Sequence, residues 1–371
     1  MNNFVSGTKI NCLDLNGQHQ QIKNEVLELF EKVYDASAFS GGPFVEEFEK
    51  SFASYCNTQY AVGLNNGTSA LHLAMLVLGI GPGDEVIIPA NTFIATAWGV
   101  SYTGATPVFV DCTFDTWQID PSKIESKITS RTKAIIGVHL YGQPFDIESV
   151  SAICKRYNLF LVEDAAQAQG ATYKGKRIGS FGEMGCFSFY PGKNLGACGE
   201  AGSIVTNNDK YYKHLLQLRN HGSHKRYHHD ELGFNMRMGG LEGASLQIKL
   251  KYLDGWNNRR QEIARRYQQE INHIRFKWQE QPFWAQSVYH LFVITSNDRD
   301  NMINYLNQHN IYPGLHYPVP CHLQKAYKNL GYQLGYCPNA EYLAGHCLSL
   351  PIYAELTDKE VSYIINTLNC Y

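Results

Sequence analysis

Charged residues are scarce in this sequence: they make up 18% of its 371 residues, and the formal net charge at pH 7 is only -2. A chain with so little net charge and a pI near 6.7 lacks the field that draws proteins to nucleic acid or to anionic membranes. Any anionic ligand must therefore be held by local groups. The hydrophobic fraction of 44% is that of an ordinary globular protein with enough apolar material for a large core.

The sequence also shows no long apolar run, no readable secretory signal and no paired cysteines. The N-terminus has no basic start followed by an apolar stretch, and the apolar run 70–78 is too short to span a bilayer and contains His72. The ten cysteines lie scattered between Cys12 and Cys370 without a CxxC pair, which is typical of reduced thiols, with a disulfide framework as the alternative. We expect a soluble, cytoplasmic protein that binds neither nucleic acid nor membrane.

The first two thirds of the chain have the pattern of an α/β protein. Two amphipathic helices are expected between residues 20 and 55, the second after the turn 40–43. From about residue 60 to 205, short apolar runs rich in β-branched residues alternate with helix-like stretches, which favours a mostly parallel sheet covered by helices. The strands expected there are Glu85–Pro89, Thr106–Val110, Ala134–His139, Phe160–Glu163, Gly185–Tyr190 and Ser203–Thr206.

The pattern changes after about residue 245. A long polar helix, expected over Glu242–Ile274, leads into a smaller α+β segment that ends near Tyr371. The sequence therefore predicts a large α/β domain with an N-terminal arm over residues 1–245 and a small C-terminal domain over residues 246–371.

The first segment that suggests chemistry is a helix start. A short strand ends at residues 65–67, and a helix is expected to open at Thr68 and Ser69, directly after Gly67. The free N–H groups and positive dipole end of such a helix start suit a phosphate. The alternative is an ordinary helix cap, since Ser and Thr are preferred there for local reasons.

The second segment is LFLVEDAAQAQGA, in which an apolar strand ends at Glu163 and Asp164. Carboxylates at this point lie at the edge where open α/β sheets bind ligands. Asp164 is suited to pairing with a protonated ring nitrogen or binding a metal ion, and capping the next helix is the alternative.

The third segment, MGCFSFYPGKNLGACGEAGSIVT, places a single lysine, Lys193, between apolar and glycine residues. A lysine is usually a solvated surface charge, but desolvation in such surroundings lowers its pKa. A neutral, accessible amine is what imine formation with an aldehyde cofactor requires. A Walker loop is excluded because Asn194 stands where that motif requires Ser or Thr.

Four segments in this order, GTSAL, EDAAQAQGA, FSFYPGKNLGACGEAG and GFNMRMGGLEGASL, resemble the sugar-nucleotide aminotransferases of the DegT/DnrJ/EryC1/StrS family. The resemblance runs from about Leu15 to the closing LSLPIYAELTDKE and covers nearly the whole chain. It implies a fold-type-I pyridoxal phosphate enzyme whose large domain has a mostly parallel seven-stranded sheet and whose small C-terminal domain is α+β.

The resemblance also implies a role for each matched position. Lys193 would carry pyridoxal 5′-phosphate as a Schiff base and, once released, act as the base and acid of the proton shift. Asp164 would keep the pyridine nitrogen protonated, which makes the ring an electron sink. Gln167 would contact the phenolic oxygen of the ring.

The remaining cofactor contacts follow from the same resemblance. The phosphate would rest on the helix start at residues 67–69 and on Ser188. Phe93, in ANTFIAT, would stack on the ring, with a plain core position as the alternative. Asn235, in GFNMR, would reach the phosphate from the partner subunit, which implies a homodimer with shared active sites.

The histidines separate into two groups. His316 and Tyr317, in GLHYPVPCHLQKAY, match a segment near the substrate in the family, and we expect them to contact sugar or phosphate, with a structural histidine as the alternative. The other group lies in a segment that matches a loop without metal, so no metal site is expected despite its composition; its members are His221, His224, His228 and His229.

Lys193 also separates two activities, because relatives that are dehydratases have histidine at this position. The stretch VHLYGQPFDI and the lysine turn resemble the subgroup that acts on dTDP-linked 3-keto-6-deoxyhexoses. The sequence therefore predicts transfer of an amino group from L-glutamate to C3 of such a sugar, for the biosynthesis of unusual amino sugars. The alternatives are amination at C4, a UDP-linked 3-keto sugar, or a cofactor-binding regulator without catalysis.

Overall fold

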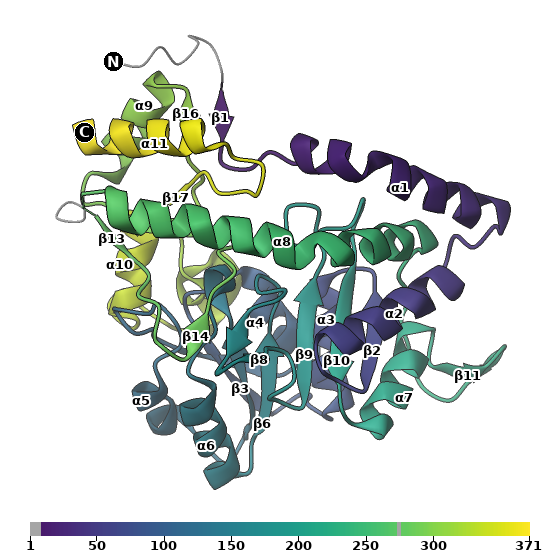
Figure 1. Cartoon of the computed structure of the whole chain (residues 1–371). Coiled ribbons are helices and arrows are strands. Elements are labelled where there is room, and N and C mark those ends of the chain that lie inside the picture. The colour runs from purple at the N-terminus through teal and green to yellow at the C-terminus, as the bar shows by residue number, and fades with distance from the viewer. Residues whose placement is uncertain (1–8, 273–275) are drawn as a thin grey trace.

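A seven-stranded sheet forms the centre of the computed structural model, which describes residues 9–272 and 276–371 (Figure 1). One strand, β10, runs antiparallel to both of its neighbours, and all other neighbouring strands are parallel. The prediction of a mostly parallel seven-stranded sheet is confirmed. In spatial order the strands are β2 (Tyr60–Leu64), β10 (Gly202–Thr206), β9 (Met184–Ser188), β6 (Phe160–Asp164), β5 (Thr132–Val138), β3 (Glu85–Pro89) and β4 (Thr106–Val110).

Two strands, β3 and β4, have the bounds that their apolar, β-branched runs predict. Every residue of β3 and β10 is buried, as is typical of strands with both faces covered. Strand β9 ends at Ser188, two residues before the expected end at Tyr190. The reason is a turn, in which the Tyr190 carbonyl already accepts the Lys193 N–H at 2.8 Å.

Helices cover both faces of the sheet, and each face has its own hydrophobic cluster. One face is covered by α3 (Gly67–Val77), α4 (Ile94–Ser101) and α7 (Asp209–Arg219). The other is covered by α2 (Pro43–Tyr55), α5 (Pro121–Ile124), α6 (Ile147–Tyr157) and the first half of α8 (Gly240–Glu270).

The C-terminal part of the chain has a third cluster around an antiparallel sheet. The N-terminal strand β1 (Ile10–Asn11) also belongs to this part, because it pairs with β16 (Ile311–Tyr312) and Ile10 lies in the cluster. The elements are β13 (Lys277–Trp278), β15 (Phe292–Thr295), β17 (Cys347–Leu350), α9 (Arg299–Gln308), α10 (Pro338–His346) and α11 (Asp358–Cys370).

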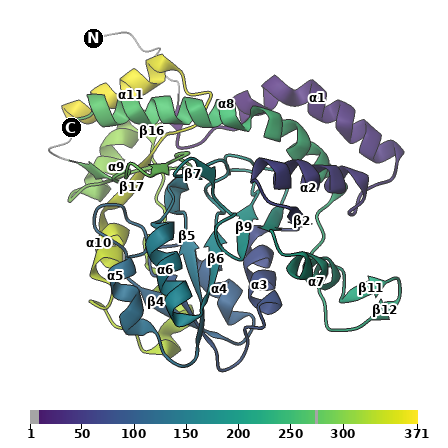
Figure 2. The same cartoon turned by 60° about the horizontal axis from the view of Figure 1, so that its bottom comes forward.

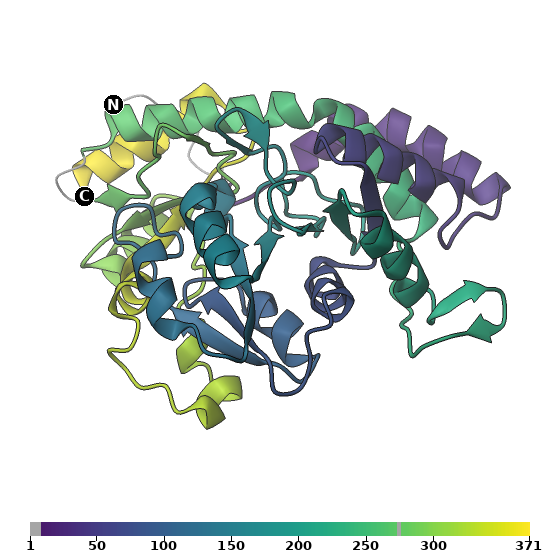
Figure 3. The ribbon, with the colours of Figure 1, turned by 90° about the horizontal axis from the view of Figure 1, so that it is seen from below.

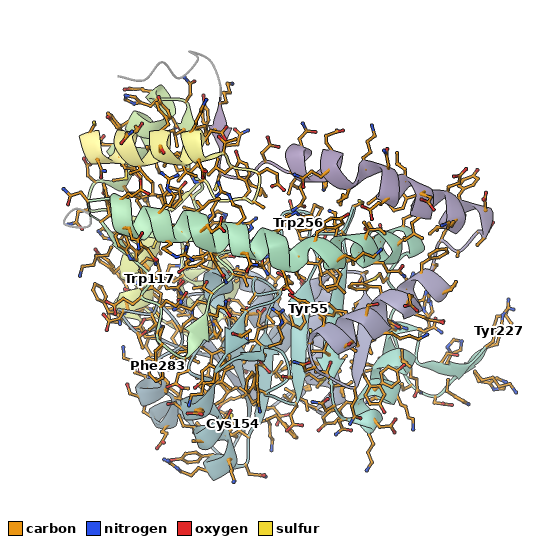
Figure 4. The ribbon with its side chains drawn as sticks, in the orientation of Figure 1. Tyr55, Trp117, Cys154, Tyr227, Trp256 and Phe283 are labelled. Atoms are coloured by element: carbon orange, nitrogen blue, oxygen red, sulfur yellow. The ribbon has the colours of Figure 1, made fainter. Side chains whose placement is uncertain are left out.

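Helix α8 runs across the molecule from the region of α1 (Asn16–Asp35) and α2 to α11 (Figure 1). Its Leu253 belongs to the cluster of the large sheet and its Tyr267 to the C-terminal cluster. Trp256, labelled in Figure 4, packs with residues of α1. The helix was expected to end at Ile274, which lies outside the described residues, and it ends at Glu270; the predicted domain boundary at residues 245 and 246 falls within it.

A hairpin of β11 (Ser223–Lys225) and β12 (His228–His229) stands off the body beside α7 (Figures 2 and 3). Tyr227, at its tip in Figure 4, is 79% exposed. A further small sheet contains β14 (Ala285–Gln286), β7 (Thr172–Tyr173) and β8 (Lys176–Arg177). In the part of the chain that the structure describes, every helix is too short or too polar to cross a lipid bilayer.

Candidate functional site

The site lies where three strands of the same direction reach their carboxyl ends. Strand β2 leads into helix α3, β6 ends at Asp164, and β9 ends at Ser188 just before the turn of Lys193. In open α/β sheets this edge is where ligands bind.

Ser188 faces the start of α3 because its two neighbours face the other way. Phe187 and Phe189 pack edge-on against Phe52 of α2, with ring centroids 5.0 and 5.1 Å apart. Since side chains alternate along a strand, Ser188 points to the opposite face. There it lies against Gly67: a Cβ atom added at Gly67 would be only 2.7 Å from the Ser188 Cβ.

Helix α3 begins at Gly67, one residue earlier than expected. Its cap is Asn66, whose side chain accepts the N–H of Ser69 at 2.8 Å. The cap is therefore neither Thr68 nor Ser69, and both lie inside the first turn. The N–H groups of Gly67 and Thr68 have no acceptor within the helix, which leaves donors and the positive end of the helix dipole beside Ser188.

Asp164 is buried, and two donors hold its carboxylate. Thr96 Oγ1 donates to Oδ2 at 2.7 Å, and the N–H of Ala166 donates to Oδ1 at 3.2 Å. The second bond closes a local turn and leaves the other oxygen to Thr96. The alternative that Asp164 caps a following helix is wrong, because β6 is followed by turns and then by β7. Burial raises the pKa of Asp164, while these bonds and the charge of Lys193 work in the opposite direction.

Lys193 lies on the turn after β9 with its side chain half-buried. Desolvation lowers the pKa of its amine to about 8, and the negative charge of Asp164 limits this decrease. Strand β6 ends at Asp164 and its parallel neighbour β9 ends just before the turn of Lys193, so carboxylate and amine belong to the same sheet edge. Near pH 8 about half of the Lys193 amines are neutral, which is the nucleophilic form.

Gln167 is held at both ends of its amide. Its Oε1 accepts the N–H of Tyr141 at 2.6 Å, and its Nε2 donates to the hydroxyl of Tyr317. Tyr141 and Tyr317 have φ angles of 61° and 55°, and their rings stack with centroids 6.1 Å apart. Left-handed backbone at bulky residues is strained and concentrates at functional sites. One Nε2 hydrogen of Gln167 remains for a ligand.

His316 and Phe93 both lie beside the ring of Tyr317. His316 Nδ1 lies 2.8 Å from Ser349 Oγ, and burial together with the charge of Lys193 lowers the pKa of His316 to about 4, so its ring is neutral. Phe93 caps α4 and is 51% exposed, so it is no core residue; its ring centroid is 6.0 Å from that of Tyr317.

Asn235 is the one predicted cofactor residue whose contacts lie apart from this group. It follows the hairpin β11–β12, forms a bridge with Asn220 and is exposed. The hairpin carries the histidine-rich segment, where His229 Nδ1 bonds to the His221 carbonyl at 2.8 Å. Among residues 9–272 and 276–371, no three or more His, Cys, Asp or Glu side chains are grouped to hold a metal ion.

Sequence reasoning missed two residues that hold the site. Thr96 lies in the segment ANTFIAT three residues after Phe93, but its bond to Asp164 joins positions 68 apart and leaves no local pattern. Tyr141 precedes Gly142 in the stretch LYGQ, where a turn signal was readable but its contact with Gln167 was not.

Three features meet at the carboxyl edge of a mostly parallel sheet. They are a lysine with a lowered pKa, a buried carboxylate, and a helix start with free N–H donors. This is the arrangement of a pyridoxal-phosphate-dependent aminotransferase of fold type I. A family model described as the DegT/DnrJ/EryC1/StrS aminotransferase family matches residues 20–369. The chain belongs to this family.

Named relatives match along nearly their whole length. The chain is 44% identical over 97% of its residues to the dTDP-3-amino-3,6-dideoxy-alpha-D-galactopyranose transaminase of Aneurinibacillus thermoaerophilus, and covers 98% of that protein. It is 40% identical to the pleiotropic regulatory protein of Geobacillus stearothermophilus, with 96% of each chain covered. It is also 40% identical to the UDP-N-acetyl-3-dehydro-alpha-D-glucosamine 3-aminotransferase of Acidithiobacillus ferrooxidans, with 98% of each covered.

Solved structures agree with the fold. The crystal structure of S. venezuelae DesV in complex with a ketimine intermediate superimposes with a TM-score of 0.95 at 40% identity, covering 97% of this chain and 98% of DesV. The structure of Ntda from Bacillus subtilis with bound cofactor PMP gives a TM-score of 0.89 at 32% identity, covering 99% and 86%. The predictions of family, fold type and enzyme class are confirmed.

Proposed function

We propose that this sugar aminotransferase moves an amino group from L-glutamate to C3 of a dTDP-linked 3-keto-6-deoxyhexose, with pyridoxal 5′-phosphate as its cofactor. The observation that carries the choice of sugar is the 44% identity, over almost the full chain, to a relative named for a dTDP-3-amino-3,6-dideoxyhexose. The position of Lys193 and Asp164 at one sheet edge, after the neighbouring strands β9 and β6, supports the chemistry.

The described residues fit this cofactor. The free N–H groups at the start of α3 and the hydroxyl of Ser188 form a cradle that a side chain at position 67 would fill, and they would hold the phosphate. Asp164 would bind the ring nitrogen, Gln167 the phenolic oxygen, and Phe93 one ring face. Pyridoxal phosphate, when bound, supplies an electron-withdrawing ring that stabilises negative charge at the carbon bearing the amino group.

The protein groups then have separate tasks. Lys193 Nζ takes the proton from Cα of glutamate and returns it one step later, for which its pKa of about 8 is close to the optimum for a base and acid near neutral pH. Asp164, to which Thr96 donates a hydrogen bond, would bind the ring nitrogen through its carboxylate and favour the protonated ring. Neutral His316 offers its free nitrogen to a sugar hydroxyl, and Tyr317 lies beside it. The order is ping-pong, with 2-oxoglutarate leaving before the ketosugar is aminated.

The proposal includes a homodimer with shared active sites that acts in the cytoplasm. Asn235 is exposed next to a hairpin that stands off the body, which suits a residue that contacts a partner's phosphate. All ten cysteines are free thiols, which fits a reducing compartment.

The experiment that tests the substrate is a panel. The protein is incubated with glutamate and with dTDP- and UDP-linked 3-keto and 4-keto sugars, and the new amine is located on the ring by NMR. Amination at C3 of a dTDP sugar is expected. A product aminated at C4, or turnover of UDP sugars alone, would replace the proposed substrate while leaving the enzyme class intact.

Two relatives define the rival functions. The relative named for a UDP-linked 3-dehydro sugar favours a change of nucleotide. The relative named as a pleiotropic regulatory protein favours a cofactor-binding regulator. Conversion of glutamate to 2-oxoglutarate with the matching absorbance change separates the regulator from the enzyme, since a regulator produces neither.

A further inference from the structure

A chain of buried side-chain amides lies beneath the turn of Lys193. Asn194, Gln169 and Asn257 are 1%, 0% and 3% exposed. Asn194 Nδ2 donates to Asn257 Oδ1 at 2.8 Å and to the carbonyl of Val288 at 2.9 Å. Asn257, on α8, donates from its own Nδ2 to the carbonyl of Gln169 at 2.9 Å. The residue that follows the lysine is thereby tied to α8 and to the start of the C-terminal part.

The same chain continues into the other two cofactor segments. Gln169 Nε2 donates to the carbonyl of Ser188 at 2.6 Å and to that of Ala166 at 3.2 Å. Ser188 ends β9, and Ala166 is two residues after Asp164. The amides therefore join the lysine turn, the end of β9 and the loop of Asp164 through a single series of hydrogen bonds.

His290 fixes the free end of the series. Its Nδ1 lies 3.2 Å from Asn194 Oδ1, an oxygen that only accepts, so this nitrogen carries the hydrogen. Burial and the positive charges of Lys193 and Arg260 keep the pKa of His290 well below its usual range, so the ring stays neutral. Arg260 in turn donates to the carbonyls of Tyr289 and His290 and holds this segment in place.

Few main-chain hydrogen bonds hold the turn of Lys193 in place. The turn is closed by the N–H of Lys193 on the Tyr190 carbonyl and by the N–H of Ala197 on the Phe189 carbonyl, both at 2.8 Å. These two bonds fix the shape of the turn but do not connect it to the loop of Asp164. The main chain ties the loop of Asp164 to β9, through the N–H of Ala165 on the Cys186 carbonyl at 2.8 Å, and the amide side chains add the connection to the turn itself.

We propose that Asn194 and Asn257 are positioning residues that hold the Lys193 amine at a fixed, desolvated place opposite Asp164. The inference rests on the proposed roles of Lys193 and Asp164 and adds the groups that set their relative position. Neither amide side chain needs to touch cofactor or substrate for this role.

The consequence is measurable on the lysine itself. Its pKa is about 8 because burial outweighs the opposing charge of Asp164, with the neutral rings of His290 and His316 as the other titratable groups nearby. A turn released from its amides would let the amine reach water, where an ordinary lysine has a pKa of about 10.4.

The test is the pH dependence of Lys193 acylation by trace acetic anhydride, followed by mass spectrometry, on the full chain freed of cofactor with hydroxylamine. Asn194→Ala and Asn257→Ala are compared with Asn339→Ala. Asn339 donates from Nδ2 to the Cys112 carbonyl at 2.7 Å, a similar bond outside this series. The pH at which Lys193 acylation is half-maximal is expected to rise by at least one unit in Asn194→Ala and Asn257→Ala. In Asn339→Ala it is expected to stay near 8.

Two results would overturn the inference: a midpoint that stays near 8 in both amide variants, or one that rises equally in Asn339→Ala. If Asn194→Ala does not yield folded protein, Asn257→Ala decides, because it breaks the series one step farther from the lysine. The acylation assay needs no turnover, so its outcome is independent of the proposed function. The proposed function is tested separately: it fails if the Lys193→Ala variant keeps its full transamination rate.

Discussion

The bond between Thr96 and Asp164 gives the most specific prediction about catalysis. Thr96 Oγ1 donates its single hydrogen to Asp164 Oδ2 at 2.7 Å and therefore accepts from Thr92 Oγ1, which lies 2.8 Å away. Both threonines are buried, so water cannot replace the donor if it is removed. The substitution Thr96→Val keeps the shape of the side chain and deletes this donor, together with the acceptor for Thr92 Oγ1.

The magnitude follows from the charge on the acceptor. A hydrogen bond to an ionised group contributes about 1.5–3 kcal/mol, and about 1.4 kcal/mol corresponds to one pKa unit. Burial already raises the pKa of Asp164, and loss of the donor destabilises the carboxylate further, so the pKa rises by about 1–2 more units. The ionised carboxylate of Asp164 is the active form. On acidification, the Thr96→Val variant is therefore expected to lose activity at a higher pH than the natural protein does.

The assay is the pH profile of kcat/KM for glutamate. In Thr96→Val the acid limb is expected to move upward by about 1–2 pH units, while the rate at alkaline pH stays close to that of the natural protein. Thr206→Val is the control, because Thr206 is equally buried and donates to the Glu183 carbonyl at 2.9 Å, away from the site. An acid limb that stays in place in Thr96→Val, or moves equally in Thr206→Val, would refute the reasoning.

Further predictions concern the base, the phosphate cradle, the dimer and the long helix. Lys193→Ala is expected to lower kcat by at least about 10²–10⁴-fold, the contribution of a positioned base and acid, in a glutamate and ketosugar assay. Gly67→Val, whose Cβ would lie 2.7 Å from Ser188, should weaken pyridoxal phosphate binding at least about tenfold, as measured by fluorescence titration; unchanged affinity would place the phosphate elsewhere. Mixing inactive Lys193→Ala and Asn235→Ala chains should restore about a quarter of the activity if sites are shared, and none otherwise. Gly255→Ala, at an exposed position of α8 with no atom within 4 Å of the added Cβ, should raise the free energy of unfolding by roughly 0.5–1 kcal/mol in urea.

The elements that were predicted well have strong local signals. The bounds of β3 and β4 follow from short apolar runs that begin and end abruptly, and Lys193 was recognisable because apolar and glycine residues surround it. The end of β9 was placed two residues late, since the bond that starts the turn at Tyr190 has no sequence signature.

The contacts that hold the site residues in place could not be predicted from local sequence patterns. The two hydrogen bonds of the Gln167 amide involve Tyr141 and Tyr317, and Tyr317 lies 150 residues away from Gln167. Both tyrosines have a left-handed backbone that bulky residues rarely adopt. The amide series beneath the lysine turn joins residues as far apart as 94 positions. Contacts of this kind are decided by the assembled core, so a single sequence indicates which residue types take part in the chemistry but not what holds them in place.

Helix α8 has a consequence for how the molecule can be divided. Its 31 residues span about 46 Å as one rod, with Leu253 anchored in the core of the large sheet and Tyr267 in the C-terminal core. A fragment cut after residue 245 would keep only its first six residues and leave the apolar surface that the rest of the rod covers open to water. We therefore expect heat or urea to melt both parts in a single transition, and protease nicking within the rod to release no stable half.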